Sequence, residues 1–266
     1  MTRTAHAFSL ILAAAAFAGS PAHGSMTKDD LASVEKLDAV TIPMPGEFFT
    51  AMGKVGQPAW GQHLRVGSPG VTDSRSLIAL GLGTLVADGY VAVEAQDGQA
   101  IKNIGKEILA LAKKLNLSQS VLGRSNSISD FADNNDWNAL REELEATQNE
   151  VKLDMVDQND DRLVTLVSLG AWIRGVDLVS GMVTKEYSPA GAKLLRQPAI
   201  IEYLLTQIDA LPESARSASP LPEIRAGLES SLPLVEPEVP SAGQIASLHK
   251  TMKALFDLIN GSAPTP

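Results

Sequence analysis

Three ionisable side chains interrupt the two most apolar stretches of this sequence. Asp88 lies within residues 77–93, and Arg174 and Asp177 lie within residues 163–183. Because Arg174 and Asp177 are three residues apart, they share a face of a helix and can form an ion pair. Charged groups inside an apolar environment are costly unless they are paired. If the two stretches pack together as helices, we expect the three side chains to form one buried ionic cluster.

Two interpretations of this cluster are open. In the one we favour, it is a structural network that fixes the register between the two helices. In the other, it is a polar pocket near Tyr90 and Trp172 that binds a ligand, or that uses Asp88 and Asp177 as a carboxylate pair in acid–base chemistry. Carboxylates about 5–10 Å apart in an open cleft would favour catalysis. A carboxylate closed off against Arg174 would favour the network.

Other motifs for catalysis or cofactor binding are incomplete. The chain has no cysteine, which excludes disulfides, thiolate metal sites and thiol nucleophiles. Residues 81–83 (Gly-x-Gly) lack the third glycine of a dinucleotide-binding turn. Residues 157–161 begin like a calcium loop, but Arg162 occupies the glycine position. His63 and His249 are isolated in the sequence, and a lone histidine is more often a solvated or packed residue. We therefore predict no cofactor and no metal site.

The two apolar stretches predict the central helices of the protein, over residues 74–95 and 162–183. Both are hydrophobic nearly all round, which is typical of burial in a helical bundle. Each approaches membrane-spanning length, but its charged residues make a transmembrane hairpin unfavourable. Each also contains three glycines, and a glycine inside a helix costs about 1 kcal/mol relative to alanine. The glycines indicate a close approach of the two backbones: Gly81, Gly83 and Gly89, and Gly170, Gly175 and Gly181.

Helical periodicity dominates the rest of the sequence, and no convincing run alternates with the period of a β-strand. The sequence therefore predicts an all-α, multi-helix bundle built around the two glycine-containing apolar central helices. An amphipathic stretch follows each central helix, which raises the alternative of a duplicated helical hairpin. The other expected helices cover about residues 28–37, 48–52, 98–115, 118–132, 136–156, 190–211 (interrupted at Pro198) and 241–260.

The domain organisation follows from the composition along the chain. Residues 212–240 contain six prolines, which is typical of a linker or a surface strap, with a short helix possible at residues 223–230. A capping box at Ser241 and Gln244 opens the last helix, and we expect its apolar face to dock on the same chain. The predicted segments are a signal peptide (1–24), an N-terminal arm with short helices (25–72), a helical bundle core (73–211), a proline-rich linker (212–240), and a C-terminal amphipathic helix and tail (241–266).

The first residues predict export. Residues 7–18 form an uncharged apolar run after Arg3, with the length of a signal-peptide core. Small residues allow cleavage after Ala18 or after Gly24, so we expect a periplasmic or secreted protein without a membrane span in the mature chain. The net charge of −9 disfavours nucleic acid as a partner. A small ligand or an envelope protein fits better.

Two short apolar segments stand out, LGTLVADGY (residues 82–90) and LGAWIRG (residues 169–175). They resemble paired signatures of a family of uncharacterised helical lipoproteins that Gram-negative bacteria export, and the resemblance extends over roughly residues 61–208. Arg174 replaces an acidic residue of the family's second signature, and the chain lacks the cysteine to which lipid is attached. The family has no known activity, so the resemblance implies an all-α fold and export.

Together these observations predict an exported, non-catalytic helical module that binds or scaffolds in the bacterial envelope. The alternative is a periplasmic enzyme that uses Asp88 and Asp177 as a buried carboxylate pair.

Overall fold

The computed structural model describes residues 45–56, 58–65, 67, 70 and 72–261. All regular elements within these residues are helices, and the predicted all-α bundle is confirmed. The signal segment and the short helix expected at residues 28–37 lie outside the described residues.

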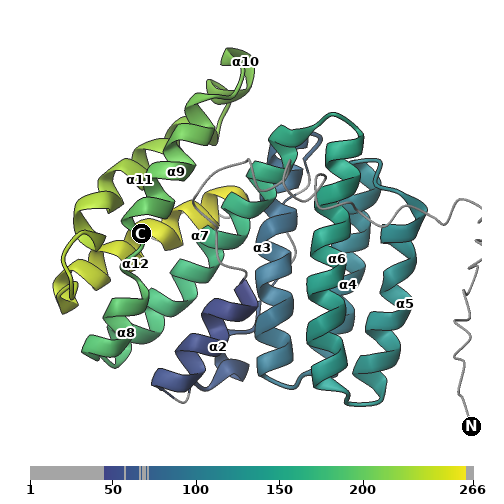
Figure 1. The fold of residues 1–266 in the computed structure, drawn as a ribbon, viewed down its shortest axis with the longest axis horizontal. Coiled ribbons are helices and arrows are strands. Elements are labelled where there is room, and N and C mark those ends of the chain that lie inside the picture. Colours follow the sequence, from purple (N-terminus) through teal and green to yellow (C-terminus); the bar gives the residue numbers. More distant parts are fainter. Residues whose placement is uncertain (1–44, 57, 66, 68–69, 71, 262–266) are drawn as a thin grey trace, which may run out of the picture. The chain divides into compact units, whose positions relative to one another are not determined.

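Two long apolar helices form the centre of the fold (Figure 1). They are α3 (Arg75–Glu94) and α7 (Asp161–Lys185), which pack against each other more extensively than any other pair. Both are long and apolar enough to cross a membrane, but 83% of the apolar window of each is buried inside the protein. Burial on nearly all sides explains why neither helix has a polar face.

Two glycines allow α3 and α7 to touch backbone to backbone. A Cβ atom on Gly83 would lie 2.0 Å from the carbonyl oxygen of Val167, and one on Gly170 would lie 2.1 Å from that of Leu80. Gly83 thus contacts the residue three positions before Gly170, and Gly170 contacts the residue three positions before Gly83. This reciprocal pattern is that of two parallel helices that cross at the two glycines. The close approach predicted from the glycines is confirmed at this pair. The other glycines of these helices face side chains: Gly81, Gly89, Gly175 and Gly181.

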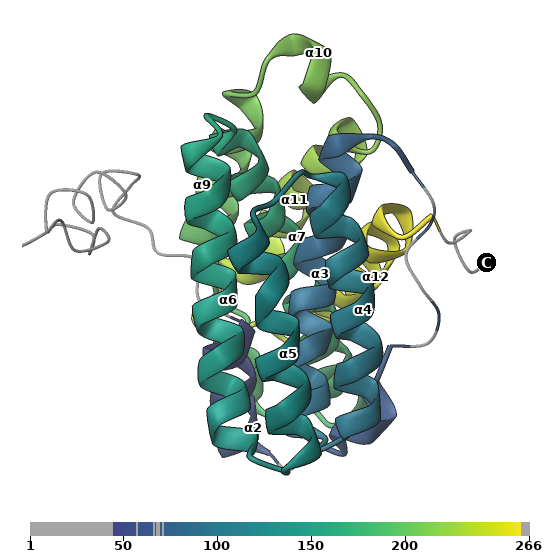
Figure 2. The ribbon, with the colours of Figure 1, turned by 90° about the vertical axis from the view of Figure 1, so that its right-hand side faces the viewer.

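Three helices cover one side of this central pair, and Figure 2 shows them next to one another in front of α3 and α7. They are α4 (Gly98–Lys114), α5 (Gln119–Asp133) and α6 (Trp137–Asp157). The Asp97 and Asp136 side chains accept backbone N–H groups at the starts of α4 and α6. Asn116, Asn135 and Asn159 take positive φ angles where α4, α5 and α6 end.

The other side consists of shorter helices. α2 (Pro45–Val55) packs on both central helices, and the 3-10 turn η1 (Trp60–His63) lies against α3. The break predicted at Pro198 is confirmed, because α8 (Pro189–Leu194) ends before it and α9 (Pro198–Asp209) begins there. The expected duplicated hairpin does not form: α3 is followed by the long α4, whereas α7 is followed by the six-residue α8.

The prediction that residues 212–240 form a linker is wrong, although the short helix considered at residues 223–230 is present as part of a longer one. This segment contains α10 (Glu213–Arg216) and α11 (Leu221–Val235), and α11 packs between α9 and α12 (Ala242–Ile259). Proline is tolerated in the first turn of a helix, where its missing N–H would have no partner. Pro222 occupies such a position, and Pro233 lies inside α11, so prolines in this segment do not exclude a helix.

The C-terminal helix α12 docks on its own chain, as predicted. The Ser241–Gln244 capping box is present at its start. Its buried face packs along α7 and against α11, and Figure 1 shows it crossing α7. The buried apolar side chains of this face are Ile245, Leu248, Met252, Leu255 and Ile259.

We predict that Gly83→Ala and Gly170→Ala each lower the free energy of unfolding by about 3 kcal/mol or more, because the added methyl group forces two backbones apart. Gly123→Ala is the matched control. Gly123 is exposed on α5, and a Cβ there meets no atom within 4 Å, so the change should raise stability by up to about 1 kcal/mol. Urea denaturation of the three variants measures both effects. Equal stabilities for all three would contradict the backbone contact.

Candidate functional site

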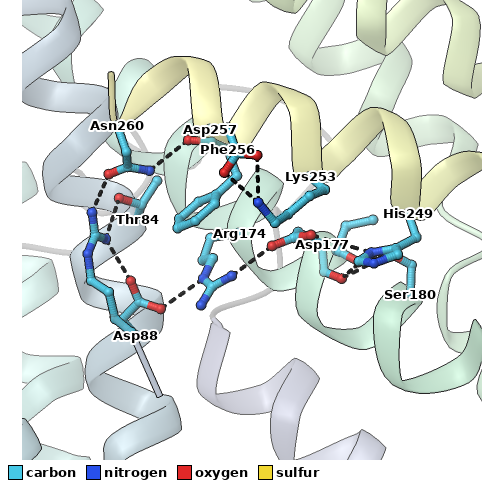
Figure 3. Close-up of polar contacts among 12 residues, drawn as sticks. Thr84, Asp88, Arg174, Asp177, Ser180, His249, Lys253, Phe256, Asp257 and Asn260 are labelled. Atoms are coloured by element: carbon cyan, nitrogen blue, oxygen red, sulfur yellow. Dashed lines mark hydrogen bonds and ion pairs between the residues drawn. The ribbon is translucent and has the colours of Figure 1, made fainter. Parts of the chain in front are cut away.

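The Asp88 carboxylate lies between two guanidinium groups (Figure 3). Arg174 Nε donates to Asp88 Oδ1 over 2.8 Å, and Arg65 Nη1 donates to Asp88 Oδ2 over 2.7 Å. The Asp88 side chain is 0% exposed, and the two arginine side chains are 6% and 8% exposed. Both carboxylate oxygens therefore have a cationic donor, and solvent does not reach them.

Arg174 links the two carboxylates of the cluster. Its Nη1 donates to Asp177 Oδ2 over 2.7 Å, one turn further along α7. Burial alone would lower the pKa of the Arg174 guanidinium, but the charges and hydrogen bonds of Asp88 and Asp177 outweigh burial and raise it. The arginine thus stays charged, and the buried cluster predicted from Asp88, Arg174 and Asp177 does form.

Helix α12 closes the cluster with an aromatic ring. The Phe256 ring centroid lies 4.1 Å from the guanidinium carbon of Arg174 and 5.6 Å from that of Arg65. Lys253 Nζ lies 6.0 Å from the same ring and donates to both oxygens of Asp257. Such cation–π contacts are attractive, and their strength increases where water is excluded.

Arg65 ties the connection before α3 to the end of α12. Its Nη2 donates to Asn260 Oδ1, and its Nη1 also donates to Thr84 Oγ1 over 3.3 Å. Nearby, the Gly70 amide donates to the Asn260 carbonyl over 3.0 Å. The cluster therefore joins the connection before α3 to α3, α7 and α12.

Two histidines lie near Asp177. The His249 ring on α12 places Nδ1 3.1 Å from the Asp177 carbonyl and 3.4 Å from Oδ1, a carboxylate oxygen that has no hydrogen bond. Gly181 leaves room for this ring, because a Cβ there would lie 2.9 Å from His249 Cε1. The His63 pKa is lowered, first by burial and then by the charges of Lys185 and Arg174.

The other two residues predicted for this site are not joined to the cluster by any described hydrogen bond or ion pair. The Tyr90 ring packs under α2, where a Cβ on Gly46 would lie 2.7 Å from Cε1. Its hydroxyl has no hydrogen-bond partner, and burial raises its pKa. Trp172 Nε1 donates to Gln197 Oε1 over 2.8 Å. Neither residue is thus part of the hydrogen-bonded cluster, and the alternative of a polar pocket near Tyr90 and Trp172 gains no support.

The cluster is electrically balanced, and its Asp88 end is closed to solvent. Its three cations are matched by three carboxylates: Arg65, Arg174 and Lys253 with Asp88, Asp177 and Asp257. Asp88 has no free oxygen to accept a proton and no path to solvent. Within the part of the chain that the structure describes, no group of three or more His, Cys, Asp or Glu side chains is placed to hold a metal ion. This geometry is that of a structural network.

A separate cavity of about 40 Å³ lies among α3, α4, α5, α6 and α7. Its walls are mostly leucine, isoleucine, valine and alanine side chains, and Arg124, Ser125, Thr147 and Gln148 are the polar residues of the lining. Gln148 of α6 differs from the other three, because it is 4% exposed and its Oε1 has no hydrogen-bond partner. An unpaired buried acceptor is costly in an empty site and becomes favourable when a ligand supplies a donor.

Four residues that matter here have weak signals in the sequence. Arg65 lies in a glycine- and proline-rich connection, where its one signal is that no other Lys or Arg occurs between residues 56 and 72. Asn260 stands at the end of the helix expected over residues 241–260, and Phe256 lies within that helix, so neither position indicates an ionic contact. Gln148 falls between Leu144 and Val151 on the buried seam of α6, and that position was the available signal.

Comparison with protein-family models, curated proteins and solved structures found no significant match. The resemblance to exported helical lipoproteins therefore stays a prediction. The function of the protein is therefore inferred from the geometry of the cluster and the cavity.

We predict that Asp88→Asn lowers the free energy of unfolding by about 3–5 kcal/mol, because it leaves two buried guanidinium groups facing an uncharged amide. Asp133→Asn is the control, since Asp133 pairs with Lys102 at the surface and should contribute less than about 1 kcal/mol. Thermal and urea denaturation measure both. An Asp88→Asn protein as stable as the wild type would contradict the structural role of the network.

Proposed function

We propose that this protein is an exported, non-catalytic helical binding module of the bacterial envelope, and that its ligand occupies the apolar cavity among α3, α4, α5, α6 and α7. The observation that carries the proposal is the buried, unpartnered Oε1 of Gln148 on the wall of that cavity. A concave apolar site with one polar group that fixes orientation is the usual form of a small-molecule site.

The closed ionic cluster supports a non-catalytic role. A carboxylate that acts as a base or nucleophile must reach a substrate, whereas both oxygens of Asp88 are bonded to guanidinium groups inside the protein. Asp177 has a side chain that is only 3% exposed, and its Oδ2 is bonded to Arg174. Its Oδ1 has no hydrogen bond and lies 3.4 Å from His249 Nδ1, but Asp88, the other member of the proposed carboxylate pair, has both oxygens bonded.

Native mass spectrometry of the protein purified from its own host tests the proposal. We expect a bound small molecule on the wild type and none on Gly105→Leu. Gly105 lines the cavity, and a Cβ there meets no atom within 4 Å, so a leucine side chain has room at this wall and also favours the helix. Gly123→Leu, on the exposed face of α5, should keep the molecule. A wild type without a ligand, or equal occupancy in Gly105→Leu, would contradict the proposal.

Export has its own test. The apolar run at residues 7–18 and the small residues after it predict a mature protein that begins at Gly19 or Ser25. N-terminal sequencing of the protein from the envelope fraction decides this, and recovery of Met1 as the first residue would overturn it.

A further inference from the structure

We infer that the cavity takes a neutral aliphatic molecule that carries a hydroxyl group, with the chain between α4 and α6 and the hydroxyl hydrogen on Gln148 Oε1. This inference rests on the binding function proposed above and specifies the chemistry of its ligand.

The walls select an aliphatic chain. The lining side chains from α4 and α6 include Ile101, Ile104 and Ile108, and Leu144 and Val151. No aromatic residue is among the lining residues, so a flat ring would find no stacking partner. Branched aliphatic walls favour a flexible chain, which gains free energy with each methylene group that it buries.

The polar groups of the cavity select a hydrogen-bond donor. The Ser125 hydroxyl donates to the Leu122 carbonyl, and the Thr147 hydroxyl donates to the Glu143 carbonyl. Their hydrogens are therefore in use, and the two hydroxyl oxygens offer acceptor lone pairs. Gln148 Oε1 adds an acceptor without a partner. A ligand that only accepts hydrogen bonds would leave this oxygen unsatisfied.

The charges around the cavity disfavour an anionic headgroup. Arg124 is the one charged residue of the lining, and it already binds two carboxylates, those of Glu143 and Glu150. A ligand carboxylate would have to displace one of them and would face the other at close range. A neutral hydroxyl avoids this repulsion.

Helix α5 is the wall that has to move for a chain to enter. The cavity of about 40 Å³ is smaller than the roughly 150 Å³ that accepts benzene in an engineered core. α5 packs on α4 and α6, and among its side chains Val121, Ile128 and Ala132 are the buried apolar ones. Its ends are held by partly exposed ion pairs of Arg124 and of Lys102, which cost little to rearrange.

Two isomeric probes test the inference by calorimetric titration of the full chain. 1-Octanol has a hydroxyl donor, whereas 1-methoxyheptane has the same atoms and no donor. We expect 1-octanol to bind wild type about tenfold more tightly than its isomer, and sodium octanoate to bind more weakly than 1-octanol. In Gln148→Leu, which removes the acceptor and keeps an apolar side chain, the two isomers should bind equally.

Two further variants separate this inference from the proposed function. Gly105→Leu should abolish binding of all three probes, and Gly123→Leu should bind them as the wild type does. If both isomers bind wild type equally and Gly105→Leu blocks both, the hydroxyl assignment is wrong and the apolar site stands. If no probe binds wild type, or if Gly105→Leu has no effect, the cavity is not a binding site and both proposals fail. Circular dichroism melting confirms that each variant is folded.

Discussion

The backbone contact between α3 and α7 at Gly83 and Gly170 is the constraint on which the rest of the structure depends. With no side chain between them there, the two helices approach until their backbones touch. α3 and α7 run parallel, and the short distance between them lets the Asp88 and Arg174 side chains bond directly across the interface, beyond the two glycines. The pair then offers one surface to α4–α6 and another to α12, so the cavity and the ionic cluster both depend on the spacing that the glycines set.

The sequence predicted the helices well because helical periodicity and caps are local signals. The Ser241–Gln244 box and the Asp136 cap place helix starts from the residues at the starts themselves. The segment from 212 to 240 was misjudged, because a count of prolines does not distinguish one in a first turn, such as Pro222, from one that ends a helix. Tertiary packing on α9 and α12 stabilises α11, and that packing has no local signature.

The residues of the candidate sites could be predicted only where a charged residue lies among apolar residues in the sequence. Asp88 and Arg174 could be found because they are charged residues within apolar helices, and such residues require partners. Arg65 and Asn260 lie 195 residues apart, and neither conflicts with its neighbours, so their contact depends entirely on the tertiary fold. Trp172 and Tyr90 were expected beside the cluster because each is two residues from one of its members, but residues two apart do not share a helix face. Trp172 instead bonds to Gln197, and Tyr90 packs against Gly46 of α2.

The way α12 completes the ionic cluster has a consequence for the order of folding. Phe256 and Asn260 belong to the last helix, whereas Arg65 precedes the first long one. Contacts so distant in sequence form late, because the chain must first lose the entropy of a very large loop. Asp88 and Arg174 therefore stay accessible to water until α12 packs against α7. The buried ionic cluster is completed only when the last helix of the described chain is in place.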